Sequence, residues 1–451
     1  MPVADLQEGM GLQMVLIVKG GYVIDPASGY EGVADILVED GKITKIGQDM
    51  RMHGEPEDCA GEPEVPEKVV INAKGKIVAP GLVDVHVHFR DPGFTYKEDI
   101  LSGARAAAKG GFTTVVLMAN TKPPVDNEET LRYVLEKGME TGIHVKTCAN
   151  ITLGMQGKEL TDMEKLSGNG AVGFTDDGIP LLDEELVKKA CEAAARAGKP
   201  LSFHEENPAF IENNGINAGK ASEYYQIGGS DRQAEIWMVK RDLALAEGTG
   251  AEISIQHIST KEAVELVREA KKKNPHIHAE ATPHHFTLTE EAAIRYGTLA
   301  KMNPPLRQEA DRQAIIEGLC DGTIDIIATD HAPHSKEEKE KAITEAPSGI
   351  IGLETALSLG IRELVEKGYM TMAKLLSRMS WQPAGFYHLD AGYLSEGGPA
   401  DMVIFDSKEQ WKAEGFYSKS GNTPFAGELL PGTIYYTICG GQIVYAKDEK
   451  E

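Results

Sequence analysis

Two histidines stand two residues apart in the stretch DVHVHFRDPG, which runs from Asp84 to Gly93. Residues i and i+2 of a strand point to the same face, so His86 and His88 would present two imidazoles side by side. Such a pair would waste a core face but suits a bound cation. Arg90 and Asp91 follow at once. The stretch therefore predicts a metal site whose remaining ligands must come from elsewhere in the chain.

Ligand-capable residues also end several later apolar runs. Asp176 and Asp177 end GAVGFTDD, His204 follows LSF, His257 follows ISIQ, and Asp330 follows IDIIAT. Four histidines and two carboxylates suit zinc or a similar borderline divalent ion. The set is too large for one tetrahedral ion and is right for two that share a bridging carboxylate. It predicts hydrolytic chemistry, in which bound water is activated by a cation and a nearby carboxylate moves its proton.

The elements that must bring these residues together alternate between strand-like and helix-like patterns. Strand-like runs are expected at 84–89, 113–120, 144–152, 170–177, 201–206, 251–258, 276–285 and 324–331. Most segments between them have helical periodicity. Eight such alternations favour an α/β fold of the (β/α)8 TIM-barrel type, in which all the named side chains would meet at the C-terminal mouth. A doubly wound sheet is the alternative, but the glycine-rich phosphate turn that it would want after its first strand is missing.

Both ends of the chain have a different texture from this middle. Residues 14–81 and 392–448 read as short strands separated by Gly-Gly and Asp-Gly turns. We expect the two ends to form one small β-sandwich domain. The predicted division is 1–80 and 386–451 for that domain and 81–385 for the barrel, with an acidic, proline-rich loop at 51–68.

Composition narrows the class of function. The chain has 451 residues with 70 acidic and 46 basic side chains, a net charge of −24. No basic stripe stands out, which argues against nucleic acid and against an anionic membrane surface as partners. Five scattered cysteines without a CxxC motif predict reduced thiols and a cytoplasmic protein. An anionic substrate would have to be met locally, by an arginine or a metal.

Several longer motifs carry a resemblance to a known family. PGLVDVHVHFRDPG, MANTKPPVDN, NITLGMQGKELTDM, GFTDDGIP, KMNPPLR, ATDHAPH and GIIGLETAL together resemble the dihydroorotases of the long-chain bacterial class, within the amidohydrolase superfamily. The resemblance covers roughly residues 14–445. It implies the interconversion of L-dihydroorotate and N-carbamoyl-L-aspartate in de novo pyrimidine (UMP) biosynthesis. It also implies a barrel with a composite β-sandwich, in agreement with the pattern above.

The resemblance assigns metal ligands residue by residue. His86 and His88 would hold a first zinc ion, His204 and His257 a second, and Asp330 would bind on the first side and act as catalytic acid and base. Many members of the superfamily bridge the two metals with a carboxylated lysine, but GAVGFTDDG contains no lysine. An aspartate would take that role, and we favour Asp177 over Asp176. Two zinc ions per chain are expected, and one is the alternative.

The same resemblance assigns the substrate contacts. Arg90 would pair with the substrate α-carboxylate in bidentate fashion, and Asn120 and His334 would bind the same group. Asn303 and the backbone near Gly349 would read the amide edges of the ring. The alternative for Arg90 is a salt bridge to its neighbour Asp91. Residues 335–349 form a charged run after the catalytic aspartate that could serve as a lid.

Rival readings concern the substrate and the activity itself. Another cyclic amidohydrolase, a hydantoinase or an allantoinase, would use similar ligands, and a catalytically silent relative could serve as a scaffold. The expected partner is a small molecule. A homodimer is also expected, and association with aspartate transcarbamoylase is a further option that the resemblance raises.

Overall fold

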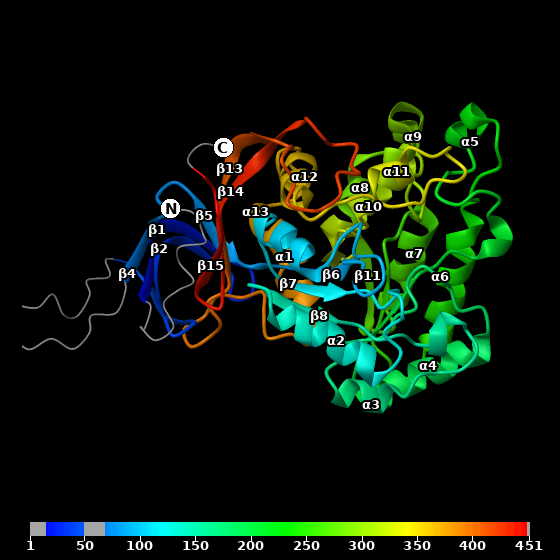
Figure 1. The fold of residues 1–451 in the computed structure, drawn as a ribbon, viewed down its shortest axis with the longest axis horizontal. Helices are drawn as coiled ribbons and strands as arrows, with labels where there is room; N and C mark the ends of the chain where they lie inside the picture. The colour runs from blue at the N-terminus through cyan, green and yellow to red at the C-terminus, as the bar shows by residue number, and fades with distance from the viewer. Residues whose placement is uncertain (1–14, 49–67, 449–451) are drawn as a thin grey trace, which may run out of the picture.

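The computed structural model describes residues 15–48 and 68–448. A sheet built from the two ends of the chain stands on one side, and parallel strands wrapped by helices stand on the other (Figure 1). The predicted loop at 51–68 lies, apart from Lys68, outside the described residues.

One eight-stranded sheet joins the two ends of the chain. Its strands are β1 (Val15–Asp25), β2 (Tyr30–Glu39), β3 (Lys42–Gly47), β4 (Lys68–Asn72), β5 (Ile77–Pro80), β13 (Met402–Lys412), β14 (Leu429–Cys439) and β15 (Gln442–Ala446). The order is β15-β14-β13-β5-β1-β2-β3, with β4 paired to β1. Because β13 pairs antiparallel with β5, starting at Met402 opposite Pro80, the C-terminal strands complete a sheet begun by the N-terminal ones. The predicted β domain made from both termini is confirmed.

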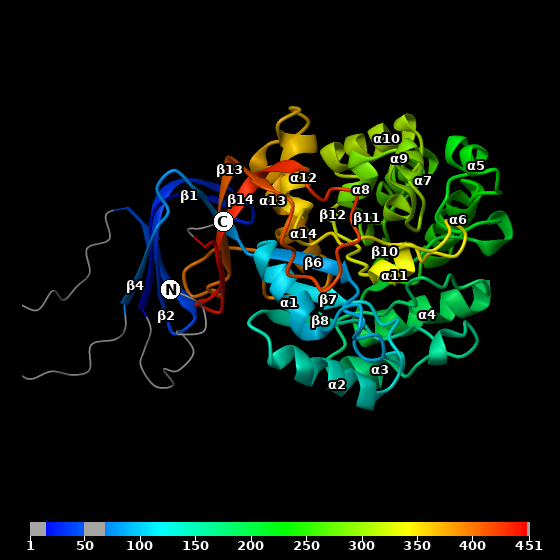
Figure 2. The same cartoon turned by 45° about the horizontal axis from the view of Figure 1, so that its top comes forward.

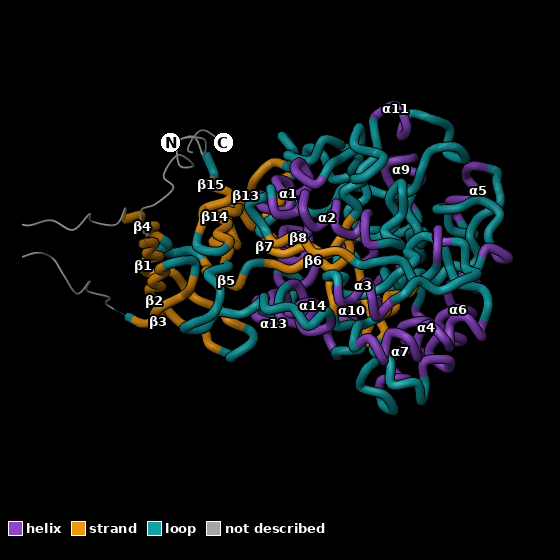
Figure 3. The backbone as a smooth tube through the Cα atoms, turned by 60° about the horizontal axis from the view of Figure 1, so that its bottom comes forward, coloured by secondary structure: helices purple, strands orange, loops and turns teal. Residues whose placement is uncertain are grey.

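The middle of the chain contributes seven parallel strands. These are β6 (Leu82–Val87), β7 (Phe112–Leu117), β8 (His144–Thr147), β9 (Leu201–Phe203), β10 (Ile253–Ile255), β11 (Ile277–Ala281) and β12 (Ile326–Ile327). They form the sheets β6-β7-β8 and β12-β11-β10-β9, and Figure 3 shows the first of these edge to edge. Single parallel bridges link the two sheets at both seams: Phe174 pairs with Ala149 and with Leu201, and Val87 pairs with His331. Eight segments thus follow one another around a ring, as expected for a (β/α)8 fold.

The fourth of these segments differs from its prediction. A strand over 170–177 was expected, but only Phe174 makes ladder pairs. One reason is that the carboxylate of Asp176 accepts the backbone N–H groups of Ile151 and Thr152, so a side chain binds donors that a longer strand would have paired with backbone. The segment therefore completes the ring with a minimum of regular structure.

Helices cover the outside of the ring (Figure 2). The α-helices are α1 (Ile100–Lys109), α2 (Glu128–Met139), α3 (Met163–Gly168), α4 (Glu184–Ala197), α5 (Lys220–Tyr225), α6 (Gln233–Ala246), α7 (Lys261–Lys271), α8 (Pro283–Thr287), α9 (Glu291–Tyr296), α10 (Glu309–Asp321), α11 (Lys336–Lys339), α12 (Ala356–Gly360), α13 (Met372–Met379) and α14 (Trp381–Phe386). Short 3-10 turns are η2 (Leu153–Met155), η3 (Pro208–Phe210) and η4 (Gly297–Ala300), and η5 (Ile361–Val365) is a π-helix that extends α12. In the described ranges, none of the helices combines the length and the apolar character needed to cross a bilayer.

The ring is closed at one end by the last residue of α14 and the chain that follows it. A buried cluster brings Phe386 and Tyr387 against apolar residues that precede the predicted site residues on their strands, including Val83, Val116 and Ile326. The hydroxyl of Tyr387 lies 2.8 Å from the hydroxyl of Ser202 inside the ring. This packing fills the N-terminal end of the ring, so a site within it must open at the carboxyl ends of the strands.

Candidate metal centre

The strand that bears His86 and His88 is fixed to the strand that precedes Asp330. The carboxylate of Asp84 on β6 accepts the backbone N–H of Thr329 at 3.1 Å and that of His86 at 3.1 Å. Burial raises the pKa of Asp84 to about 6, while these hydrogen bonds oppose the rise. The hydrogen bond to Thr329 sets the register between β6 and the chain that follows β12. The polar side chains after these two strands therefore lie at the same level of the ring.

The predicted ligands meet at the carboxyl ends of the strands. His86 Nε2 lies 3.4 Å from Asp177 Oδ1, and His88 Nε2 lies 3.4 Å from Asp177 Oδ2. The same oxygen, Asp177 Oδ1, also lies 3.6 Å from His204 Nδ1 and 3.7 Å from His257 Nε2. His86 and His257, 171 positions apart in the sequence, thus share one small volume with the other ligands.

Asp177 belongs to two ligand groups at once. One group comprises His86, His88 and Asp177, the other Asp177, His204 and His257, and within each the donor atoms lie within 4.8 Å of one another. Asp176 faces away, because its carboxylate is taken up by backbone and side-chain donors of residues 150–152. The geometry therefore places Asp177, and not Asp176, where a bridging carboxylate would stand.

Asp330 completes the first group. Its Oδ1 lies 3.0 Å from His88 Nε2 and 3.6 Å from His86 Nε2. Burial alone would raise the pKa of Asp330, but the hydrogen bond from His88 and the charge of His86 hold it below its ordinary value. The carboxylate is thus ionised under ordinary conditions, as a ligand or a proton acceptor must be.

The donor set fits a divalent cation. His86 Nε2 and Asp177 Oδ1 are buried, face each other and have no hydrogen-bond partner among the described residues. Buried polar atoms without partners are costly, and a cation between them would remove that cost. Imidazole nitrogens with carboxylate oxygens are the donors that zinc and related borderline ions prefer.

A second layer of side chains orients the ligands, and part of it was not anticipated from the sequence. Glu280 on β11 lies 3.1 Å from His86 Nδ1, which leaves Nε2 to face Asp177. Glu206 lies 3.1 Å from His204 Nε2 and so leaves Nδ1 toward the cluster. A glutamate between Ala279 and Ala281 in the strand-like run was the available signal for Glu280, because a buried carboxylate needs a partner.

Asn120 lies in this layer rather than apart from it. Its Oδ1 is 3.0 Å from His88 Nδ1, and its Nδ2 donates to Asp177 Oδ2 at 3.1 Å. The residue was predicted to bind the substrate carboxylate. Its amide is engaged by two predicted ligands, so it also orients them.

Three predicted site residues adopt a backbone conformation that is rare outside glycine. The φ angles are +59° at Arg90, +32° at His257 and +49° at Asp330. Left-handed backbone costs L residues free energy and persists where the surroundings enforce it, often at functional sites. In each case the residue lies two or three positions after the end of a strand, at the carboxyl end of the ring.

Arg90 and His334 lie together beside the cluster. Arg90 Nε donates to the backbone oxygen of Pro333 at 3.2 Å, and its Nη2 lies 3.4 Å from His334 Nε2. The alternative salt bridge is not formed, because Asp91 accepts the hydroxyl of Tyr133 at 2.9 Å and no ion pair to Arg90 occurs in the described ranges. The guanidinium retains donors for an anionic ligand.

Asn303 and Gly349 occupy different situations. Asn303 Oδ1 is buried and has no partner within the described part of the chain, as expected of a group that awaits a ligand. The N–H of Gly349 donates to Lys301 O, and its carbonyl accepts Asn422 Nδ2. A Cβ at Gly349 would meet Ala332 Cβ at 2.6 Å and His334 Nε2 at 3.3 Å. Glycine there leaves room for His334, whereas the polar groups of its backbone are already paired.

Two adjacent histidines of the seventh unit lie in helix α8, not in the predicted strand end. His285 is held by Thr282 Oγ1 at 2.7 Å and by Pro304 O at 3.0 Å, so it steadies the chain next to Asn303. His284 Nε2 is buried without a partner among the described residues, and burial lowers its pKa to about 4. It is therefore neutral, in keeping with a supporting role.

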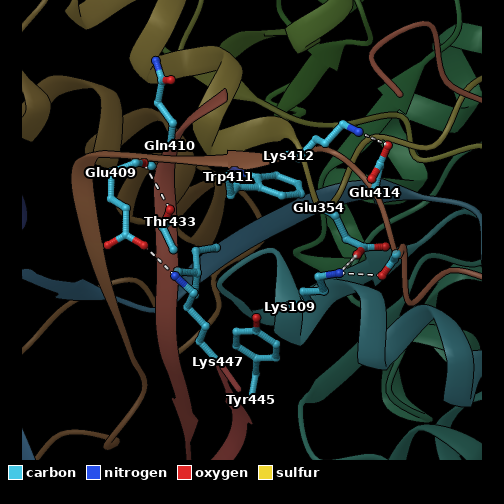
Figure 4. A pocket seen from close by; sticks show the side chains of 13 residues that line it. Lys109, Glu354, Glu409, Gln410, Trp411, Lys412, Glu414, Thr433, Tyr445 and Lys447 are labelled. Carbon is cyan, nitrogen blue, oxygen red and sulfur yellow. Dashed lines mark hydrogen bonds and ion pairs between the residues drawn. The ribbon is translucent and has the colours of Figure 1, made fainter. Parts of the chain in front are cut away.

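A separate cavity of about 420 Å³ lies between α1, β13 and β14 (Figure 4). Its charged side chains pair with one another: Lys109 with Glu354, Lys447 with Glu409, and Lys412 with Glu414. None of the predicted ligands lines it. Its charges are internally compensated, and it plays no part in the metal centre.

Comparison with known proteins agrees with this geometry. A family model described as the amidohydrolase family matches residues 77–444. The dihydroorotase of Clostridioides difficile (strain 630) is 53% identical over 431 residues, covering 96% of this chain and 100% of the relative. The dihydroorotases of Clostridium acetobutylicum and Streptococcus pneumoniae serotype 4 are 50% and 48% identical, over 96% of this chain and 99% and 100% of the relatives. The chain belongs to the dihydroorotases of the amidohydrolase family.

Solved structures support the same fold. The L-hydantoinase (dihydropyrimidinase) from Arthrobacter aurescens superposes with a TM-score of 0.83 at 26% identity, covering 96% of both chains. A D-hydantoinase superposes with a TM-score of 0.82 at 23% identity, covering 96% of this chain and 95% of its own. The dihydroorotase assignment therefore rests on sequence relatives, while these structures show the shared α/β architecture.

Proposed function

We propose that the protein is a dihydroorotase, a metal-dependent hydrolase that interconverts L-dihydroorotate and N-carbamoyl-L-aspartate in pyrimidine biosynthesis. The observation that carries the proposal is the position of Arg90 and His334, side by side next to the paired ligand groups. A guanidinium there suits a substrate that carries a carboxylate beside the bond to be cleaved. Curated dihydroorotases near 50% identity over almost the whole chain agree with it.

We assign two zinc ions to the centre, with one as the alternative. His86, His88 and Asp330 would hold the first, His204 and His257 the second, and Asp177 both. When bound, the ions would supply Lewis acidity and would activate water for attack. The sharing of Asp177 by both ligand groups favours two ions over one.

The chain's own residues would perform the remaining steps. Asp330 would accept the proton of the attacking water and return it to the ring nitrogen as the amide C–N bond breaks. Arg90 and Asn120 would hold the substrate carboxylate. His334 would add a contact to that group, and Asn303 would bind the ring amide edge through its unpaired Oδ1. Gly349 would act by shape, since it keeps space for His334.

A ring-opening assay with three substrates tests the function. Purified enzyme should open dihydroorotate, and turnover of dihydrouracil and allantoin should be lower by at least about 10², because neither offers Arg90 a carboxylate and an unpaired Arg90 costs binding. Arg90→Ala should abolish this preference mainly by raising KM for dihydroorotate. Equal turnover of dihydrouracil would point to a hydantoinase, and no turnover in fully metallated protein would point to a scaffold.

The broader setting is also a proposal. We infer a cytoplasmic enzyme that acts on a small molecule, since the four described cysteines are unpaired thiols. A homodimer is proposed, as is the option of assembly with aspartate transcarbamoylase. We further propose that residues 81–385 form the catalytic unit and that 1–80 and 386–451 form the β domain.

A further inference from the structure

A second group of metal-ligand side chains lies at the opposite end of the barrel from the catalytic centre. His144 begins β8, Asp401 precedes β13, and Cys439 ends β14. One donor atom from each lies within 4.8 Å of the others. The three come from three elements, two in the composite sheet and one in the ring.

The contacts within this group are direct. His144 Nε2 lies 3.0 Å from Asp401 Oδ2. The thiol of Cys439 donates to the backbone oxygen of Thr113 at 3.6 Å, and its sulfur lies within 4.8 Å of the donor atoms of His144 and Asp401. The second oxygen of Asp401 accepts the N–H of Gly440 at 2.7 Å, which fixes the carboxylate with Oδ2 turned toward the other two side chains. The group is therefore preorganised around one point.

Burial makes the arrangement chemically selective. Asp401 and Cys439 are 2% and 4% exposed, while the His144 side chain is 42% exposed and leaves a route from solvent. Zinc bonds to sulfur, nitrogen and oxygen of about 2.0–2.3 Å would require the donors to draw together by only about 1 Å. Thiolate with imidazole excludes hard ions such as Mg²⁺ and Ca²⁺ and selects zinc or another soft or borderline ion.

We propose that His144, Asp401 and Cys439 form a second, non-catalytic site for a zinc-like divalent cation, which clips the barrel strand β8 to the C-terminal strands of the β domain. Three protein ligands leave a fourth position for water, reached past His144. The proposal does not depend on the identity of the substrate, because no residue of the catalytic centre takes part. Binding would join the start of one barrel strand to two sheet segments that lie 257 or more positions away in sequence.

Cobalt gives a signal that separates this site from the catalytic one. A thiolate bound to Co²⁺ produces near-ultraviolet charge transfer, and the predicted catalytic ligands include no sulfur. Full-length protein would be stripped of metal, kept reduced with a phosphine and titrated with Co²⁺. We expect one thiolate–cobalt band per chain, which equimolar Zn²⁺ displaces.

Matched variants make the result decisive. Cys439→Ser should remove the band, while Cys320→Ser, which alters a thiol outside the group, should keep it. His144→Gln, at a half-exposed position that folding tolerates, should weaken cobalt binding by about tenfold or more. All three should retain ring-opening activity, which checks that they fold. Absence of the band in the wild-type protein, its persistence in Cys439→Ser, or unchanged affinity in His144→Gln would overturn the proposal.

Discussion

Three aspartates near the mouth of the ring differ in task because their oxygens face different partners. The carboxylate of Asp176 accepts hydrogen bonds from residues 150–152 and stabilises the backbone there. Asp177 Oδ1 faces His86, His204 and His257, while its Oδ2 faces His88, so the carboxylate contacts both histidine groups. Asp330 contacts His86 and His88 through the same oxygen, Oδ1. Identical side chains thus suit three different tasks: Asp176 supports the backbone, and in the proposed mechanism Asp177 would bridge the metals and Asp330 would transfer the proton.

The proton-transfer role predicts the behaviour of Asp330→Asn. Asparagine keeps an oxygen toward His88 but cannot accept a proton, so most bound metal should remain while kcat falls by about 10² or more. Metal content and initial rates on the same preparation measure both. Asp325→Asn is the matched control, because Asp325 precedes the same strand and pairs with Lys271 at the far end. Wild-type turnover in Asp330→Asn would remove Asp330 from the mechanism.

Glu280 offers a test of ligand orientation at the residue scale. Glu280→Gln replaces the charged acceptor of His86 Nδ1 with a neutral amide, so zinc affinity should fall by about 10- to 100-fold. Competition with a chromogenic chelator measures that affinity. Glu252→Gln is the control, since Glu252 also pairs with histidines, His278 and His388, but outside the centre. Equal affinities in the two variants would show that Glu280 does not tune the metal.

The ligands themselves could be predicted from the sequence, whereas their supports could not. His86 and Asp330 end apolar runs, and the topology of a barrel brings strand ends together. Glu206 contacts His204, two positions before it in the chain, whereas Glu280 contacts His86 on another strand. The pairing of Glu280 with His86 depends on three-dimensional register, which no local pattern records.

At the scale of elements, the segment 335–349 is held by two buried lysines. Lys339 Nζ donates to the carbonyls of Pro347 and Gly349 at 2.8 and 3.0 Å. Lys301 Nζ donates to the carbonyls of Ile343 and Ala346, both at 2.7 Å. The segment predicted to serve as a lid is therefore held in place by these lysines. The carbonyls that Lys339 binds flank Ser348, whose own carbonyl is hydrogen-bonded to His334.

Lys339→Met should loosen this segment without touching the metal. Methionine fills similar volume but removes the donor to the partly buried Pro347 carbonyl, at a cost of about 1 kcal/mol, whereas the Gly349 carbonyl keeps Asn422 Nδ2. Because His334 is hydrogen-bonded to the carbonyl of Ser348 in this segment, we expect KM to rise about tenfold with kcat changed less than twofold. Steady-state kinetics provides the measurement. Lys336→Met, at a side chain that is 82% exposed, should behave as wild type. A fall in kcat alone would contradict this role.

The same lysine gives stability a defined pH dependence. Burial, helped by the charge of Lys301, lowers the pKa of Lys339 to about 7. Above that pH and below the ordinary lysine pKa, the unfolded chain binds a proton that the folded chain does not, so stability should rise with pH. Thermal unfolding from pH 7 to 10 should show this slope, and Lys339→Met should reduce it. An identical slope in the variant would exclude Lys339 as its source.

Element boundaries could be predicted only where local and tertiary signals agree. The stretch 99–111 carries both an Asp99 cap and helical periodicity, and α1 follows it closely. Thr282 and Pro283 are a cap and first-turn signal that was outweighed by the apolar run before them, so α8 was missed. At 170–177 the sequence pattern predicts a longer strand, but the hydrogen bonds of Asp176 to the backbone of Ile151 and Thr152 replace part of its pairing.

At the scale of the whole molecule, one strand belongs to two cores. Along β13, Met402 and Ile404 pack in the core of the composite sheet, while Val403 and Phe405 pack in the core of the barrel. This alternation follows from the two-residue period of a strand. The sequence could not show that β13 contributes to both cores. Both faces of the strand are apolar, and the barrel core that covers one of them is formed by distant segments of the chain. The β domain is thereby fused to the barrel along a shared strand.

This fusion predicts that the two parts unfold together. Ile404→Ala and Phe405→Ala alter neighbours on opposite faces of β13, both fully buried, and should each cost about 2–5 kcal/mol. If the cores are coupled, calorimetry should show a single transition that both variants shift downward. Removal of the catalytic metal should lower that same transition, because a ligand bound only to the native state stabilises every part that unfolds with it. Two resolved transitions, with Ile404→Ala moving one and chelation moving the other, would show that the β domain and the barrel are independent despite the strand they share.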